Sequence, residues 1–118
     1  MIDFVKKNDI YKIIRITGNQ NNILGIVFNT KSTTTNQIEV TEWDFPELEI
    51  PNQTRTSKQE VLNQVLIGLK NVNESLGTNY KFSKIYFVPY DLSKGGIYSR
   101  LTATLVRHYH HGHEFKEQ

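Results

Sequence analysis

The stretch SKQEVLNQVLIGLKNVNESLG at residues 57–77 decides the fold class, because it predicts a helix with both ends marked. Ser57 and Glu60 have the spacing of a capping box, in which each side chain accepts a hydrogen bond from a backbone N–H of the first turn. Gly77 can take the positive φ that ends a helix. The apolar residues between these ends recur every three or four positions and form one stripe: Val61, Leu62, Val65, Leu66, Leu69, Val72 and Leu76.

Three segments before this helix have the composition or the alternation of strands. Residues 9–17 and 23–28 are rich in isoleucine, and the glycine and asparagines of 18–22 between them predict a hairpin turn. Residues 37–43 alternate between apolar and polar side chains, which predicts the third strand of a meander with one solvated face. Residues 44–56 contain two prolines and no clear period, so we expect a connection there.

After the helix, residues 82–88 predict a fourth strand, with Phe82, Ile85 and Phe87 as core candidates. Residues 97–111 fit both a helix, through Tyr98, Leu101, Leu105 and Tyr109, and a strand, through Ile97, Leu101, Ala103 and Leu105. Helix is the preferred interpretation, because the run exceeds ordinary strand length and a glycine follows it. The sequence therefore predicts a single α+β domain over residues 1–118. Its expected architecture is a small antiparallel sheet of about four strands with two helices packed on one face, in the order β-β-β-α-β-α.

Length and composition narrow the class of protein. A chain of 118 residues fits one domain of ordinary size. It contains no cysteine, which excludes a disulfide framework, a thiolate zinc site and a cysteine nucleophile. No apolar run approaches the roughly 18 residues of a membrane span, and residues 1–7 lack the apolar core of a secretory signal. We therefore expect a cytoplasmic protein that does not bind a membrane.

Four histidines gather near the end of the chain, at 108, 110, 111 and 113, with Glu114 beside them. In a helix His108 and His111 would share a face, and in a strand His108 and His110 would, so either pair could chelate a metal. No third ligand of known geometry accompanies them, and no nucleophile or oxyanion signature occurs elsewhere. We therefore expect no metal, no cofactor and no catalytic residue, and a metal-binding or enzymatic protein remains an alternative.

A basic helical face is the second alternative. If 97–111 is helical, Arg100, Thr104, Arg107 and His111 lie opposite the apolar stripe, where Arg100 and Arg107 could contact phosphates. Such a face is more often solvated surface, and the net charge of +2 is too small to indicate nucleic acid by itself. A small nucleic-acid-binding module that uses Arg100, Arg107 and the lysine of the predicted first strand, Lys12, is thus kept as an alternative, and no nucleic-acid partner is expected.

The distribution of acidic residues is more informative than the net charge. Five of the twelve acidic residues lie within eleven positions, with no lysine or arginine among them. Aromatic anchors within a rim of one charge sign are typical of a docking surface for a basic protein. An equally simple interpretation places the rings in the core and leaves the acids to solubilise a loop. The predicted partner-binding residues are Glu39, Glu42, Trp43, Asp44, Phe45, Glu47 and Glu49.

The stretch FSKIYFVPYD at 82–91, the GIY at 96–98 and the LVRHYHHGHEF at 105–115 resemble the C-terminal ends of small bacterial immunity proteins. These proteins belong to contact-dependent growth inhibition and related polymorphic toxin systems. The resemblance covers about the last third of the chain and implies binding and neutralisation of one cognate toxin domain, often a nuclease, in the cytoplasm. A nuclease has a basic substrate-binding surface, so the acidic residues of 39–49 would suit such a partner.

Overall fold

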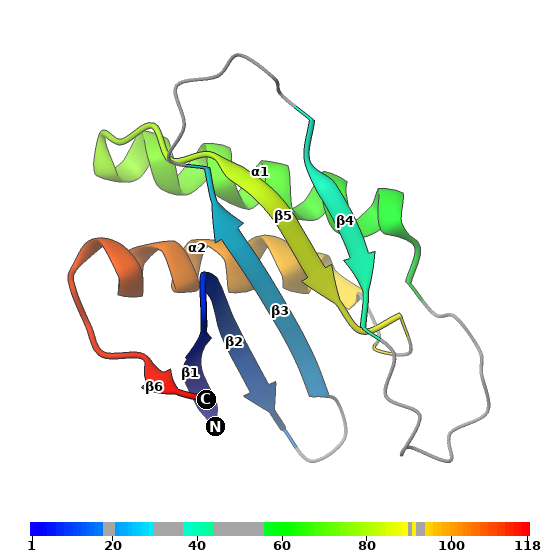
Figure 1. The fold of residues 1–118 in the computed structure, drawn as a ribbon. Helices are drawn as coiled ribbons and strands as arrows, with labels where there is room; N and C mark the ends of the chain where they lie inside the picture. The colour runs from blue at the N-terminus through cyan, green and yellow to red at the C-terminus, as the bar shows by residue number, and fades with distance from the viewer. Residues whose placement is uncertain (18–20, 30–36, 44–55, 90, 92–93) are drawn as a thin grey trace.

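The chain folds into a layer of strands covered on one side by two helices (Figure 1). The computed structural model describes residues 1–17, 21–29, 37–43, 56–89, 91 and 94–118. Among these residues, no helix has the length and apolarity that crossing a membrane requires. The elements are β1 (Ile2–Lys7), β2 (Ile10–Ile16), β3 (Asn21–Phe28), β4 (Glu39–Glu42), α1 (Lys58–Leu76), β5 (Phe82–Phe87), the 3-10 turn η1 (Lys94–Gly96), α2 (Ile97–His110) and β6 (Lys116–Glu117).

The six strands form one mixed sheet in the order β4-β5-β3-β2-β1-β6. The neighbours β1, β2, β3 and β5 pair antiparallel, whereas β4 lies parallel to β5 and β6 lies parallel to β1. The predicted α+β class and its two helices are confirmed, and both helices lie on the same side of the sheet in Figure 1. The sheet differs in detail from the predicted one of about four antiparallel strands, because it has six strands and the two at its edges pair parallel to their neighbours.

The strand predicted at 37–43 exists as β4, but the predicted meander is wrong. A meander would pair β4 with β3, whereas β5 lies between them: Ile26 of β3 pairs with Ile85, and Val40 of β4 pairs with Ile85 from the other side. β5 carries three buried apolar residues, whereas β4 has an exposed glutamate at each of its two ends. The more apolar strand is therefore central, where both of its edges are hydrogen-bonded, and the more polar strand is at the edge.

Two strands have no counterpart in the predicted order. β1 pairs with β2 along its whole length, from Ile2 opposite Arg15 to Lys7 opposite Ile10. β6 has two residues and continues the sheet beyond β1, with Lys6 opposite Glu117. These pairings make the sheet two strands wider than predicted on the side away from β4.

Helix α1 begins and ends as its sequence predicts. The backbone N–H of Glu60 donates a hydrogen bond to Ser57 Oγ at 3.2 Å, and Gly77 has φ 68° in the left-handed region. Most of the predicted stripe is buried, but Leu66 is 40% exposed because it lies at the margin of the stripe. At Gly68 the helix is so close to α2 that a Cβ would clash with the backbone oxygen of Ser99.

The ambiguous segment 97–111 is the helix α2, so the helical interpretation is confirmed. Its threonines do not interrupt the helix, because Thr102 Oγ1 donates a hydrogen bond to the carbonyl of Tyr98 within the helix, at 2.7 Å. The buried residues follow the helical spacing: Ile97, Tyr98, Leu101, Thr102, Leu105 and Val106.

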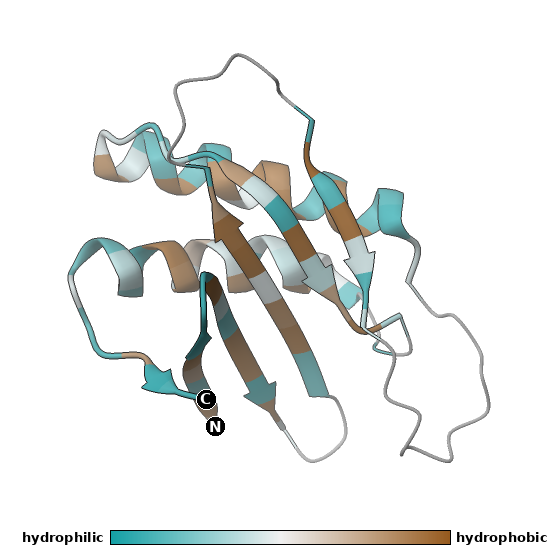
Figure 2. Cartoon of the chain, in the orientation of Figure 1, coloured by the Kyte–Doolittle hydropathy of each residue, from teal (hydrophilic) through white to brown (hydrophobic). Residues whose placement is uncertain are grey.

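The hydrophobic core fills the space between the helices and one face of the sheet. On the strands it contains Ile13, Leu24, Ile26, Ile85 and Phe87, and Figure 2 shows how hydrophobic β3 is along its length. The residues between them in each strand point to the opposite face, which neither helix covers in Figure 1. We call this opposite side the open face of the sheet.

Candidate functional site

The acidic segment begins on the edge strand β4. Glu39 and Glu42 are both exposed, as a partner-binding role requires, but they point to opposite faces of the sheet because their positions differ by an odd number. Glu39 lies opposite Lys84 and Glu42 lies opposite Phe87. The structure thus places the two glutamates on one edge without bringing them to one face. The other predicted residues, Asp44, Phe45, Glu47 and Glu49, lie outside the described residues.

Trp43 lies on the open face, directly after β4. Its ring stacks on Tyr86 at a centroid distance of 5.3 Å and an interplanar angle of 15°. A Cβ at Gly25 would be 2.6 Å from Cη2 of this ring, so the glycine makes room for it. Lys12 Nζ lies 5.1 Å from the ring centroid, and burial, followed by the charge of Lys7, lowers the pKa of Lys12. The half-buried Trp43 therefore packs outside the helix-covered core, on a surface that a partner can reach.

The basic groups of the nucleic-acid alternative do not form one surface. Arg100 and Arg107 are exposed on α2, and Arg107 Nη2 donates a hydrogen bond to Ser75 Oγ at 3.2 Å. Lys12 lies on the open face of the sheet, on the side away from α2. A nucleic-acid strand crossing one side of the molecule would therefore meet only part of this positive charge.

Two of the histidines are engaged in contacts within the protein. His108 stacks on Phe4 at 3.6 Å, and its Nε2–H donates a hydrogen bond to the carbonyl of Glu114 at 2.7 Å. His110 Nδ1 is 2.8 Å from the hydroxyl of Tyr80. Within the described ranges, no group of three potential ligands is arranged to hold a metal ion. These two histidines thus have structural partners that account for their positions.

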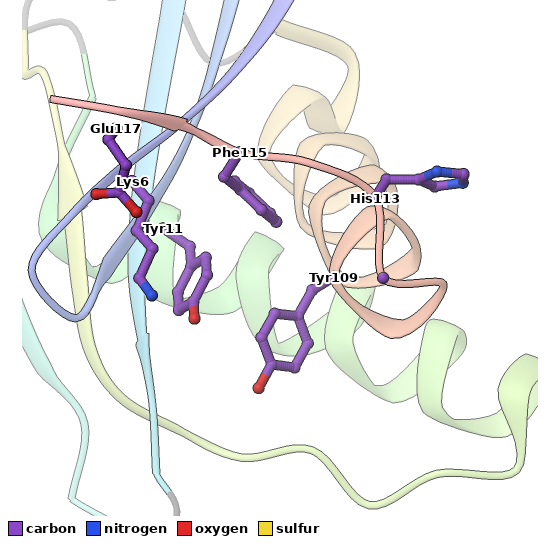
Figure 3. Close-up of a pocket in the computed structure, with 7 residues that line it drawn as sticks. Lys6, Tyr11, Tyr109, His113, Phe115 and Glu117 are labelled. Atoms are coloured by element: carbon purple, nitrogen blue, oxygen red, sulfur yellow. The ribbon is translucent and has the colours of Figure 1, made fainter.

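A pocket of about 290 Å³ lies at the β6 edge of the sheet, opposite the β4 edge, between the end of α2 and the start of β6 (Figure 3). Sequence reasoning did not identify it, because its residues come from β1, β2, α2 and the C-terminal segment and share no motif. Burial, together with the charges of Tyr11 and Tyr80, raises the pKa of Tyr109 in its wall. The side chains that line the pocket are Lys6, Tyr11, Tyr109, His113, Phe115 and Glu117.

Buried polar groups gather at the N-terminal end of α2. Tyr98 is completely buried, and burial raises its pKa to about 12. Burial also raises the pKa of Asp91 to about 6, although a backbone hydrogen bond from Ile23 acts in the opposite direction. The backbone oxygen of Asp91 accepts a hydrogen bond from Thr56 Oγ1 at 2.6 Å. These contacts join the loop after β5 to the segment before α1.

The comparisons with known proteins add no relative to these observations. No family model, no curated protein and no solved structure matches the chain. The candidate sites therefore depend on the geometry of the chain itself: the acidic edge at β4 with Trp43, and the pocket beside β6.

Proposed function

We propose that this chain is an immunity-type protein that binds and neutralises a toxin domain, and that the β4 edge is its contact surface. The observation that carries the proposal is the position of Glu39 and Glu42 on the edge strand β4, directly before the half-buried Trp43. An edge strand has backbone groups on one side that can pair with another chain, and acidic side chains favour a basic partner.

Trp43 supplies the apolar part of this surface. Its ring is held flat on the open face by Tyr86 and Gly25, so little side-chain freedom is lost when a partner covers it. Tryptophan is enriched among residues that dominate binding energy, whereas charges at the rim mainly raise the association rate. In this proposal, the acids steer a basic nuclease domain and Trp43 anchors it.

The proposal expects a toxin domain to be encoded immediately upstream of this gene, and the test titrates that purified domain calorimetrically with the protein. Changing Glu42, Asp44 and Glu47 together to lysine is expected to weaken binding by about a thousandfold, because attraction becomes repulsion at three positions. The matched control changes Glu74 and Glu114, which are exposed on other surfaces, to lysine and should leave the affinity within about threefold. Unchanged affinity of the triple variant, with its circular dichroism intact, would exclude the β4 edge.

Glu39→Lys alone is a finer test of the geometry. Glu39 shares the open face with Trp43, whereas Glu42 points to the other face, so Glu39→Lys should weaken toxin binding more than Glu42→Lys does. Equal effects of the two single variants would indicate that only the overall charge matters and that the position on β4 does not.

A further inference from the structure

The pocket beside β6 has walls made of three aromatic rings from three separate parts of the chain. The ring of Tyr11 meets Tyr109 edge to face at 5.1 Å and 77°, and it meets Phe115 in the same way at 4.9 Å and 76°. Phe28 stacks against Tyr109 at 4.2 Å and covers one face of that ring. A flat group in the pocket therefore has the other face of Tyr109 to stack against.

The rim of the pocket carries one cation and one anion. Lys6 and Glu117 are partners in the β1–β6 pairing, and Lys6 Nζ lies 5.1 Å from the centroid of the Tyr11 ring. A hydrogen bond with Tyr11, the charge of Tyr11 and the charge of Glu117 raise the pKa of Lys6. Figure 3 shows Lys6, Tyr11, Tyr109 and Phe115 around the hollow, whereas the ring of His113 points away from them.

This arrangement selects the charge and size of a ligand. A cation would compete with Lys6, which already occupies the position beside the Tyr11 ring. An anion would gain from Lys6 about what it loses to the adjacent Glu117, and a purely apolar ring would make no hydrogen bond with either group, whereas a ring with a donor and an acceptor can bond to both. A volume of about 290 Å³ is at the small end for ligand pockets, which limits the occupant to one ring system.

We propose that the pocket beside β6 binds a neutral, planar heteroaromatic ring with hydrogen-bond acceptors and donors side by side, the chemistry of a nucleobase. The ring stacks on Tyr109, its acceptor faces the ammonium of Lys6 and its donor faces the carboxylate of Glu117. This site goes beyond the proposed toxin-binding function and is independent of it, because β4 and β6 are the two opposite edges of the sheet.

The experiment titrates the isotope-labelled full chain with free adenine, cytosine and uracil, and follows the NMR signals of the Tyr11, Tyr109 and Phe115 rings. Benzyl alcohol, benzoate and benzylammonium serve as apolar, anionic and cationic ring controls. We expect saturable shifts with at least one nucleobase, and at least tenfold weaker binding of all three controls. Absence of saturation with every nucleobase, or equal binding of any ring control, would overturn the proposal.

Variants at the rim test the assigned contacts. Lys6→Met and Glu117→Gln should each weaken nucleobase binding about tenfold, since each removes one charged hydrogen-bonding group. Lys7→Met is the matched control, because Lys7 is exposed and points to the opposite face of the sheet, and it should leave binding unchanged. If Lys6→Met does not fold, Glu117→Gln decides alone, and wild-type affinity in Glu117→Gln would overturn the assignment.

Discussion

The two edges of the sheet are built in different ways. At the β4 edge an acidic strand adds to β5, and its aromatic residue, Trp43, lies flat on the open face. At the β6 edge a strand of two residues adds to β1, and its aromatic residue, Phe115, turns toward the helices and closes a pocket. The first edge is an exposed surface suited to a macromolecule, and the second is a hollow suited to a small ligand.

This difference shows what places an aromatic ring on an edge. Trp43 depends on one small residue, Gly25, which leaves space above the sheet. Phe115 depends on a cluster of rings that includes Phe4 at 5.9 Å and His108 at 4.8 Å. A ring held on the open surface by a few contacts stays accessible to a partner, whereas a ring within a cluster holds a pocket in a fixed shape.

The largest effect on stability is expected from a substitution in the contact between α1 and α2, which supports both edges of the sheet. Gly68→Ala should lower the free energy of unfolding by about 2 to 3 kcal/mol, because the new Cβ meets the backbone of Ser99. Helix propensity alone predicts the opposite sign, a gain of about 1 kcal/mol. Urea denaturation measures the change, and Asn71→Ala, at an exposed position of the same helix, is the control for propensity.

A smaller effect is expected from Phe115→Ala at the β6 edge, about 2 kcal/mol, since a half-buried ring with three aromatic neighbours is lost. Hydrogen exchange should show faster opening of β1 amides, with β4 and β5 amides unaffected. Lys116→Ala, which removes only an exposed ion pair to Asp3 with a distance of 3.8 Å, should cost less than about 0.5 kcal/mol. Equal loss of protection at both edges would contradict the separation.

Trp43→Ala at the β4 edge should cost about 1.5 kcal/mol, because the contacts with Tyr86 and Lys12 are lost on a surface that is already partly hydrated. The change is measured by urea denaturation, with Trp43→Phe retaining part of the stability. Trp43 is also the single tryptophan of the chain, so its fluorescence reports this edge alone. Its emission should change in Lys12→Met and stay constant in Phe115→Ala.

The smallest effect concerns pH and lies at neither edge. Burial raises the pKa of Asp91 to about 6 from a usual value of 3.8, so the folded state holds this proton more tightly than the unfolded state. The contribution of Asp91 to stability is full below about pH 4 and is lost as pH rises through about 6. Asp91→Asn should remove this dependence and raise the Tm at pH 7.5 by roughly 2–5 °C relative to wild type, with no gain at pH 4. A Tm difference independent of pH would contradict it.

The sequence alone predicts the parts of the fold that depend on local patterns. Helix α1 has its cap and its period within 21 residues. In α2, the spacing of Leu101, Leu105 and Val106 fits a helix and not the alternation of a strand. Alternation in β4 correctly separates Val40 from Glu39, since a period of two decides which face each side chain takes. It contains no information on which strand lies beside it, so the pairing of β4 with β5 could not be predicted.

For the candidate sites, too, the sequence predicts the features that depend on local patterns and misses those that depend on distant residues. The exposure of Glu39 and Glu42 follows from composition, whereas the position of Trp43 depends on Gly25, eighteen residues earlier in the chain. In β1, Ile2 and Phe4 do flank Asp3 with a strand-like alternation, and this signal could have identified the strand. β6 is too short for any period, so the pocket that it borders could be found only in three dimensions.

The pairing of Lys6 with Glu117 has a consequence for how the chain is made. The two residues are 111 positions apart (117 minus 6), and at roughly 5 to 20 residues per second their synthesis is separated by about 6 to 22 s. During that interval the outer side of β1 has no strand to pair with on the nascent chain. A ribosome-bound chain therefore presents an unpaired strand edge that the finished protein covers at Val5 and Lys6, and neighbouring nascent chains on one messenger are the molecules best placed to join it.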